Sequence, residues 1–179
     1  SLSLPTSIEF IAEDAFADIY NVNYITLGSP NEFYEDIYVA EDGKITDWNA
    51  IIEKNSNKLV LGCMNTIIPD TVTSIGDYAF YAVNKLTDIE IPEGVQTIGK
   101  TSFAKCSTLN TVTIPKSVTS IGNQAFLDIE DSVTLKVYEN SYAHTYAKNN
   151  NIKYELIKEG ITISGTVTSY GSDESELTS

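Results

Sequence analysis

Histidine is nearly absent from the sequence, which contains one histidine, one methionine, one tryptophan and two cysteines among 179 residues. A metal cluster built on histidines, or a nucleophile activated by one, therefore has little material beyond His144, which is expected on the surface of a helix. Cys63 and Cys106 lie 43 residues apart, match no zinc-ligand spacing and are interpreted as small core residues. No carboxylates come with a glycosidase motif. The sequence thus predicts no enzymatic activity and no bound cofactor or metal.

Positive charge is also scarce. The chain has 11 lysine and arginine residues against 25 aspartate and glutamate residues, and its net charge is -14. Because phosphate contacts need a basic surface, this composition excludes an electrostatic nucleic-acid binder. No apolar run approaches the roughly 18 residues that span a bilayer, so no membrane insertion is expected. The opening stretch, SLSLPTSIEF, lacks the basic and apolar regions of a signal peptide and is interpreted as a mature or trimmed terminus.

The sequence does contain an internal repeat. IPDTVTSIGDYAF begins at Ile68, IPEGVQTIGKTSF at Ile91 and IPKSVTSIGNQAF at Ile114, with a constant step of 23 residues. Leu4 and Leu27 show the same step, and Ile68 follows Leu27 after 41 residues, which is one step of 23 plus an insertion of 18. Regular repetition at this length predicts a solenoid, in which each unit contacts only its neighbours.

Each repeat has two halves. The first, such as LTDIEIP, alternates apolar and polar residues as a half-buried strand does, and it ends at proline. The second is predicted to form a compact arc with about one turn of helix after Gly76. Stacking places equivalent side chains in columns, so Phe80, Phe103 and Phe126 are expected to pile up in one dry interior. The predicted fold is α/β: a right-handed β-α solenoid of 23-residue repeats.

These stretches closely resemble the leucine-rich repeats of the BspA-type family, which read L-x-x-I-x-I-P-x-x-V-x-x-I-G-x-x-A-F-x-x-C-x-x-L. NAIIEKNSNKLVLGCMNTIIP (49–69) is similar to the family's inserted β-hairpin, and VYENSYAHTYAKNNNIKYELI (137–157) to its C-terminal cap. The resemblance implies a secreted or surface-anchored protein of a host-associated bacterium, with an adhesive or interaction role and an unknown ligand.

Domain boundaries follow from where the pattern holds. The leucine-rich repeat solenoid is predicted over residues 1–157, with the insertion at about 28–64 and the cap at about 137–157. Residues 158–179 are interpreted as a linker or as the truncated start of a following β module. For residues 170–179 the alternative is a disordered tail.

Aromatic residues gather in the insertion, where Trp48 accompanies Phe33, Tyr34 and Tyr38. Two interpretations remain open at this point. These rings either pack the hairpin onto the solenoid or form an exposed platform for a glycan or peptide.

The outward face of the strand ladder is the predicted ligand-binding surface, together with the insertion. The candidate residues are Tyr24, Thr26, Ile67, Asp88, Glu90, Thr111, Thr113 and Lys136 on the ladder, and Trp48 in the insertion. Six strands spaced about 4.8 Å apart offer only about a few hundred Å2 on this concave face, whereas a stable interface needs roughly 800 Å2 per partner. Weak binding is therefore expected unless the hairpin, further repeats or multivalent display contribute.

The predicted function is a non-enzymatic, extracellular interaction or adhesion module of a bacterial surface or secreted protein. Its partner would be a protein or glycan of the host or of a neighbouring cell. Two alternatives remain: a structural spacer that presents a neighbouring domain, and a substrate-binding appendage of a larger secreted enzyme. A ligand screen without any hit would favour the spacer.

Overall fold

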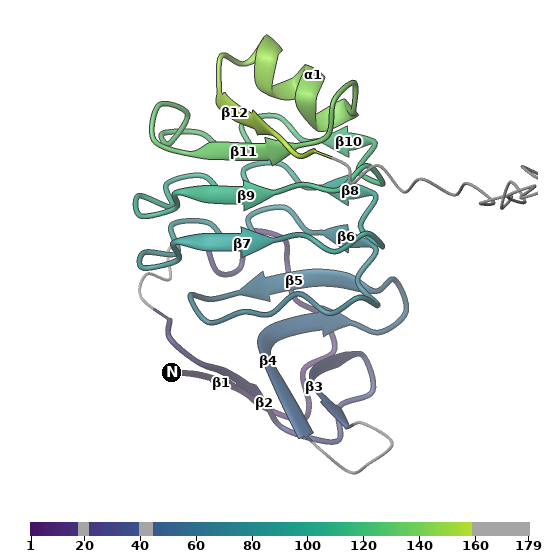
Figure 1. The fold of residues 1–179 in the computed structure, drawn as a ribbon. Helices are drawn as coiled ribbons and strands as arrows, with labels where there is room; N and C mark the ends of the chain where they lie inside the picture. The colour runs from purple at the N-terminus through teal and green to yellow at the C-terminus, as the bar shows by residue number, and fades with distance from the viewer. Residues whose placement is uncertain (18–21, 40–44, 159–179) are drawn as a thin grey trace, which may run out of the picture.

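The repeats stack as a solenoid of about six turns. The structure is a computed structural model that describes residues 1–17, 22–39 and 45–158. Within these ranges its regular elements are twelve strands and one helix, joined by turns (Figure 1). The predicted linker or β module after Lys158, including its alternating stretch at 161–167, lies outside the described residues.

One parallel sheet contains the strands that the sequence predicts before Pro92 and Pro115, together with two strands that follow them. Its four strands are arranged in the order β12 (Lys153–Leu156), β11 (Thr134–Val137), β9 (Thr111–Thr113) and β7 (Asp88–Glu90). The register pairs residues 23 positions apart along β7, β9 and β11, so that Ile89 lies beside Val112 and Val112 beside Leu135. The predicted stacking of equivalent positions is confirmed for these turns.

A second sheet lies on the other side of the coil. It is ordered β10 (Ser120–Ile121), β8 (Thr97–Ile98), β6 (Ser74–Ile75), β5 (Lys58–Gly62), β4 (Ile45–Glu53) and β3 (Tyr34–Val39). The pairs from β10 to β5 are parallel, whereas β4 pairs antiparallel with both β5 and β3. A third sheet contains only β1 (Leu2–Leu4) and β2 (Ile25–Leu27).

The arcs between the two sheets are turns rather than helices. Residues 77–82, 100–105 and 123–128 form turns, and the one α-helix of the described residues is α1 (Tyr142–Asn149). The expected helical turn after Gly76 is absent there, so the α/β part of the prediction is not confirmed. Backbone hydrogen bonds join each arc to the next instead: the Phe80 amide donates to the Ser102 carbonyl at 2.8 Å, and the Phe103 amide to the Ala125 carbonyl at 2.8 Å.

Left-handed backbone conformations recur in these arcs at the repeat interval. The φ angles of Tyr78, Thr101 and Gln124 are 57°, 56° and 59°, although none of these residues is glycine. Such conformations cost roughly 1–2 kcal/mol per residue. The hydrogen bonds between stacked arcs offset that cost, because each arc holds the next in the same shape.

The phenylalanine column fills the interior of the arcs. The rings of Phe80 and Phe103 stack with centroids 5.0 Å apart, and those of Phe103 and Phe126 with centroids 5.5 Å apart. All three side chains are buried, as the sequence predicts. The column starts against Gly62, where a Cβ atom would lie 2.1 Å from the Phe80 ring. Glycine at this position therefore makes room for the first ring.

The hairpin of β4 and β5 is buried on both faces. Ala50, Ile51 and Ile52 are all fully buried in β4, and Leu59 is fully buried in β5. Consecutive apolar residues are the pattern of a strand that is covered on both sides. Ile52 and Leu59 pack into the core of the later repeats, whereas Ile51 packs into a separate N-terminal core. Two hydrophobic cores therefore lie on either side of the hairpin, and the predicted column of stacked phenylalanines belongs to the core of the later repeats.

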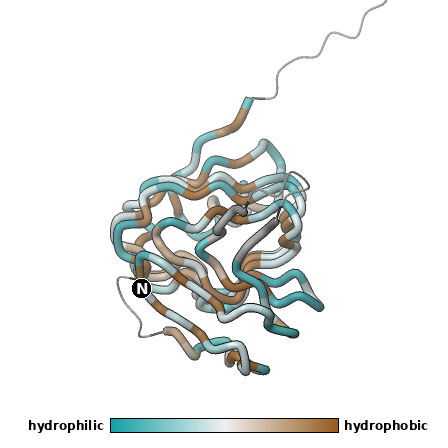
Figure 2. Tube along the Cα trace, turned by 90° about the horizontal axis from the view of Figure 1, so that it is seen from below, coloured by the Kyte–Doolittle hydropathy of each residue, from teal (hydrophilic) through white to brown (hydrophobic). Residues whose placement is uncertain are grey.

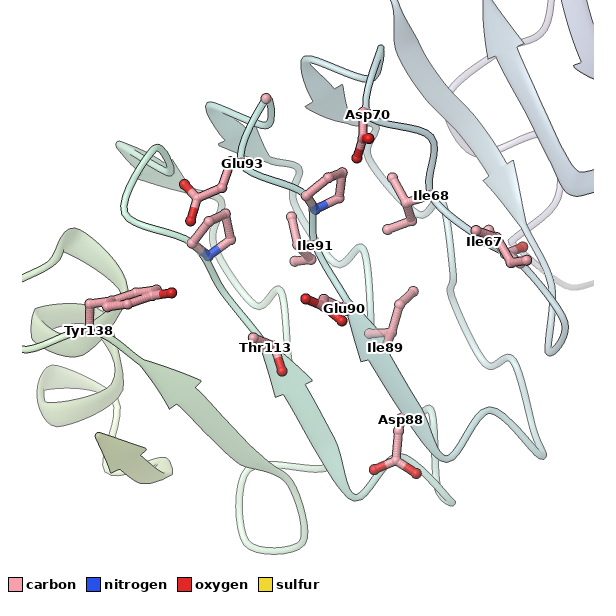
Figure 3. A pocket seen from close by; sticks show the side chains of 14 residues that line it. Ile67, Ile68, Asp70, Asp88, Ile89, Glu90, Ile91, Glu93, Thr113 and Tyr138 are labelled. Carbon is pink, nitrogen blue, oxygen red and sulfur yellow. The ribbon is translucent and has the colours of Figure 1, made fainter. Parts of the chain in front are cut away.

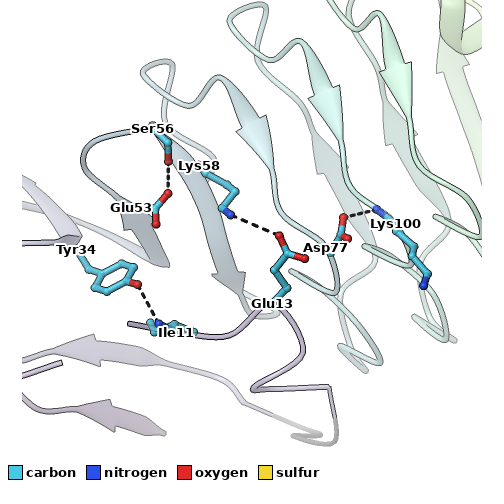
Figure 4. A network of polar contacts seen from close by, with 8 residues as sticks. All are labelled: Ile11, Glu13, Tyr34, Glu53, Ser56, Lys58, Asp77 and Lys100. Atoms are coloured by element: carbon cyan, nitrogen blue, oxygen red, sulfur yellow. Dashed lines mark hydrogen bonds and ion pairs between the residues drawn. The ribbon is translucent and has the colours of Figure 1, made fainter. Parts of the chain in front are cut away.

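The N-terminal segment is held against the hairpin by polar contacts (Figure 4). The Tyr34 hydroxyl accepts a hydrogen bond from the Ile11 amide at 3.0 Å, and Lys58 lies 3.8 Å from Glu13 in an ion pair. Tyr34 is buried and Phe33 is half-buried against the N-terminal core. Both rings thus pack the insertion onto the coil, which is the first of the two interpretations above. The side chains of Tyr38 and Trp48 lie outside the described residues.

The predicted six-strand ladder is interrupted at the insertion. β7 pairs with β9 alone, and residues 66–69 form no strand. After the hairpin, the Thr66 hydroxyl donates to the Asn49 carbonyl at 2.6 Å, and the Asn65 amide side chain donates to the Asn23 carbonyl at 3.1 Å. These side-chain bonds replace the backbone ladder, so the outward face is divided into a four-stranded and a two-stranded sheet.

The helix α1 and strand β12 lie at the end of the stack. Ser141 caps the helix, since its Oγ accepts from the His144 amide at 3.1 Å. Ala143 and Ala147 are buried, and the Tyr146 ring lies 6.2 Å from that of Phe126. Along the described chain, no helix has the length and hydropathy that crossing a membrane would require. Viewed along the stack, hydrophobic and hydrophilic residues alternate along the chain (Figure 2).

Truncating the middle ring of the column tests the stacked interior. We expect Phe103→Ala to lower the free energy of unfolding by about 3–5 kcal/mol, because it leaves a cavity between two stacked rings. Chemical denaturation measures this loss. As a control, Tyr142→Ala removes a ring that is 45% exposed and should change the stability by about 0.5 kcal/mol or less. Equal losses in the two variants would contradict the packing.

Candidate functional site

The outward face of the four-stranded sheet carries most of the predicted ligand-binding residues. Asp88 and Glu90 project from β7 and are exposed, whereas Thr111 and Thr113 on β9 are half-buried. The register places Asp88 beside Thr111 and Glu90 beside Thr113. Alternation along each strand explains this arrangement, because Ile89 and Val112 point the other way into the core.

An open groove of about 670 Å3 lies over β7 and the segments around it (Figure 3). One wall is formed by residues 66–70, where Ile67 is 62% exposed. Tyr138 lies on the opposite side, and Asp88 and Glu90 project from β7 between the two sides. Tyr138 is half-buried, and the ammonium group of Lys116 lies 5.2 Å from the centre of its ring. The volume is within the range of about 300–1,000 Å3 that small-molecule sites occupy.

The structure brings together only part of the predicted set. Ile67, Asp88, Glu90 and Thr113 line the groove. Thr111 and Lys136 belong to the same sheet face but lie outside the groove lining.

The remaining candidates lie elsewhere. Thr26 belongs to β2 and Tyr24 directly precedes it, so both are part of the two-stranded sheet and neither lines the groove. The backbone of Trp48 belongs to β4, and its side chain is outside the described residues.

Asp70, Glu93 and Tyr138 are among the lining residues that were not sequence candidates. They come from loops rather than from strands. Asp70 and Glu93 each follow the proline that ends a strand segment, and they are 23 residues apart. Since Gly94 brings its turn close to the Asp70 carbonyl, where a Cβ would lie 2.8 Å away, the two turns pack directly on each other. The repeat position after proline was therefore the signal that could have identified both carboxylates.

Negative charge dominates the groove. Asp70, Asp88, Glu90 and Glu93 are all exposed, and no lysine or arginine lines it. A hollow lined by charges of one sign and walled by apolar groups concentrates the electrostatic potential inside it. The groove can thus attract a cation, and it repels phosphate, sulfate and carboxylate groups.

Asp88 is held in its charged form. The Thr111 hydroxyl donates to its Oδ1 at 2.5 Å, and this bond, with that from Thr87 and the charge of Lys136, lowers the pKa of Asp88 despite partial desolvation. Because the pKa is lower in the folded chain, ionised Asp88 stabilises the fold above the pKa of an unfolded aspartate. That contribution is lost as the pH falls through the lowered value.

The residues that sequence analysis considered for chemistry have structural roles here. Cys106 is fully buried, its Sγ lies 2.9 Å from the Phe80 carbonyl, and burial raises the pKa of its thiol to about 12. Cys63 is also fully buried. The prediction that both are core residues is confirmed. His144 lies partly exposed on α1, as expected, and its ring packs 4.8 Å from that of Tyr154. Throughout the ranges that the structure describes, no three His, Cys, Asp or Glu side chains are grouped as metal ligands.

A coil of 23-residue repeats, with stacked parallel strands on one side and aligned columns of apolar side chains inside, is a leucine-rich repeat solenoid. The sequence matches the model of the BspA type leucine rich repeat region in six copies over residues 50–173, and the chain belongs to this family. A comparison with curated proteins finds no significant match.

Two solved structures are similar to this chain. A leucine-rich repeat protein from Eubacterium ventriosum is 26% identical with a TM-score of 0.57, over 77% of this chain and 36% of that protein. The pneumococcal vaccine antigen PcpA is 14% identical with a TM-score of 0.46, over 88% of this chain and 56% of that protein. The chain thus spans only about a third to a half of the length of these two proteins.

Removing the hydroxyl that supports Asp88 tests the electrostatics of the groove. We expect Thr111→Val to raise the pKa of Asp88 towards its ordinary value, because the main bond to the ionised carboxylate is lost. The midpoint of Asp88 in a carboxyl-carbon NMR titration measures this shift. Thr111→Ser keeps the hydroxyl and should leave the midpoint low, whereas an equal rise in both variants would contradict this assignment.

Burial of the two thiols predicts their reactivity. Neither Cys63 nor Cys106 should react with Ellman's reagent at pH 8 in the folded protein, since reaction requires an exposed thiolate. Both should react after denaturation in guanidinium chloride. Fast labelling of either thiol under native conditions would be inconsistent with its place in the core.

Proposed function

We propose that the chain is a non-enzymatic interaction module that binds a macromolecular partner through the outward face of its four-stranded sheet. The observation that carries the proposal is the groove over β7, which interrupts an otherwise regular and polar strand face. A purely structural repeat needs no such hollow. Family membership supports the same role, because the resemblance to BspA-type repeats implies interaction or adhesion.

The proposal places the module outside the cell, on the surface of a bacterium or in a secreted protein. This location rests on what the family resemblance implies. The partner would be a host or neighbouring-cell molecule, and the acidic groove is a poor match for nucleic acid or for anionic lipid.

The architecture proposed with it is one right-handed solenoid domain over residues 1–157, interrupted by the insertion at about 28–64. In this proposal α1 and β12 form its C-terminal cap. The contacts that support the cap are the pairing of β12 with β11 and the packing of Tyr146 next to Phe126. Covering the last turn removes an open end on which other chains could pair.

Binding rather than catalysis is the chemistry that the groove supports. Its carboxylates project from an open surface, and the thiols of the chain are buried away from it. The lining is small compared with the roughly 800 Å2 per partner of a stable interface. A single copy should therefore bind weakly, and display of several copies should raise the apparent affinity by about 100-fold or more.

Blocking the sheet face with uncharged bulk tests this function. The chain, displayed as tetramers, is screened against mucin glycans, extracellular-matrix proteins and plant polysaccharides. We expect binding to at least one of them, and a loss of about tenfold or more in the double variant Thr111→Tyr, Thr113→Tyr, whose rings cover the face.

The matched control is Thr97→Tyr, Ser120→Tyr, which adds the same rings to exposed positions of the opposite sheet. It should bind as the unmodified chain does, and both double variants are checked for unchanged thermal unfolding. No binding at any valency would favour the structural spacer, and turnover of a bound polysaccharide would overturn the non-enzymatic assignment.

A further inference from the structure

We propose that the groove over β7 binds a cationic, extended segment of a partner protein, with a lysine or arginine on each side of an aliphatic residue. This inference rests on the proposed function and specifies the partner of the same site. Three observations support it. The sheet face has no partner, the aliphatic side chain of Ile67 is exposed, and the carboxylates of Asp88 and Glu90 are aligned along β7.

Charge complementarity favours a basic occupant. Four carboxylates enter the groove, and none of its lining residues carries a positive charge. Lys136 acts on Asp88 from two strands away, and Lys116 lies against the Tyr138 ring, but neither lysine belongs to the lining. A basic segment would therefore neutralise charges that the chain itself leaves in excess. Sialylated and sulfated glycans are negatively charged, as the groove is, and are therefore disfavoured.

The spacing of the carboxylates favours an extended chain. Asp88 and Glu90 lie on the same face of β7, two residues apart, which corresponds to about 7 Å along a strand. Alternate side chains of a second extended segment have the same spacing. Two basic residues at positions i and i+2 of such a segment can therefore face the two carboxylates at once. Asp70 and Glu93 continue the negative charge beyond the end of the strand (Figure 3).

Ile67 supplies the apolar part of the recognition. It is 62% exposed on the wall of the groove, although the equivalent positions of the next three repeats are Glu90, Thr113 and Lys136. Covering an exposed isoleucine removes apolar surface from water, which favours binding. An aliphatic residue of the bound segment, placed between its two basic residues, would pack on Ile67. This contact explains why the position is apolar here and polar in the next three repeats.

The interruption of the ladder lies directly beneath the groove. The Ile91 amide donates to the Thr113 carbonyl at 3.0 Å, so odd-numbered residues of this stretch point their backbone groups towards β9. The backbone N–H and C=O groups of Asp88 and Glu90 point towards residues 65–68. Within the described chain, no backbone hydrogen bond joins residues 65–68 to β7. These groups are an additional source of polar contacts for a bound peptide backbone.

Nuclear magnetic resonance titration with short peptides tests the inference. The probes are three capped pentapeptides that differ only at two positions: glycine–lysine–isoleucine–lysine–glycine, and the same peptide with glutamine or with glutamate in place of lysine. The lysine peptide should shift the amide signals of β7 and Thr113 in a saturable way. The glutamine peptide should bind at least about tenfold more weakly, and the glutamate peptide should cause no shifts at these positions.

A charge-reversal pair provides the matched control. Glu90→Lys with Glu93→Lys should weaken binding of the lysine peptide at least about tenfold, whereas Glu32→Lys with Asp131→Lys, at exposed positions outside the groove, changes the net charge equally and should leave it nearly unchanged. Raising the salt concentration should weaken binding to the unmodified chain. Equal binding of the lysine and glutamine peptides, or equal losses in both charge-reversed chains, would overturn the inference.

The two proposals fail separately. If the multivalent screen finds a partner that the tyrosine-blocked face cannot bind, but the peptides show no preference for lysine, then the interaction module stands and the cationic partner is wrong. If the screen finds no partner at all, the proposed function itself fails.

Discussion

Backbone hydrogen bonds between residues one repeat apart are the constraint on which the structure depends. They join the parallel strands on one side of the coil, the two-residue strands on the other, and the arcs between them. The Gln96 amide donates to the Thr73 carbonyl at 2.8 Å, and the Thr119 amide to the Gln96 carbonyl at 2.9 Å, so one bond type recurs from turn to turn. Because these bonds fix the register, every side chain stacks on its equivalent and no turn needs a core of its own.

The same register explains both the interior and the candidate site. Inward positions of equivalent type form apolar columns, such as the three stacked phenylalanines. Outward positions vary from turn to turn without disturbing the coil, since they contribute nothing to the columns. A groove of distinctive charge can therefore arise from substitutions at a few outward and turn positions, here Glu90, Asp70 and Glu93, on a scaffold that stays unchanged.

Sequence reasoning was most successful where periodicity alone decides the outcome. The pairing of β7, β9 and β11, the phenylalanine column and the burial of Cys106 all follow from the constant step. The arcs were predicted less well, because left-handed conformations at Tyr78, Thr101 and Gln124 are imposed by neighbouring arcs and leave no mark in residue type. Only part of the site was predicted. The strand residues Asp88 and Glu90 follow from alternation, whereas the loop residues Asp70 and Glu93 can be found only if it is known which turns pack together.

Because the hairpin is covered on both faces, it contributes side chains to two hydrophobic cores, Ile52 and Leu59 to one and Ile51 to the other. In a linear array, cooperativity passes only through neighbouring contacts. The later repeats can consequently stay folded while the turns before the hairpin unfold locally. The two parts would then differ in their protection against hydrogen exchange. A mechanical force applied at the N-terminus would unfold the smaller, N-terminal core first. The acidic groove would keep its shape until the hairpin itself unfolds.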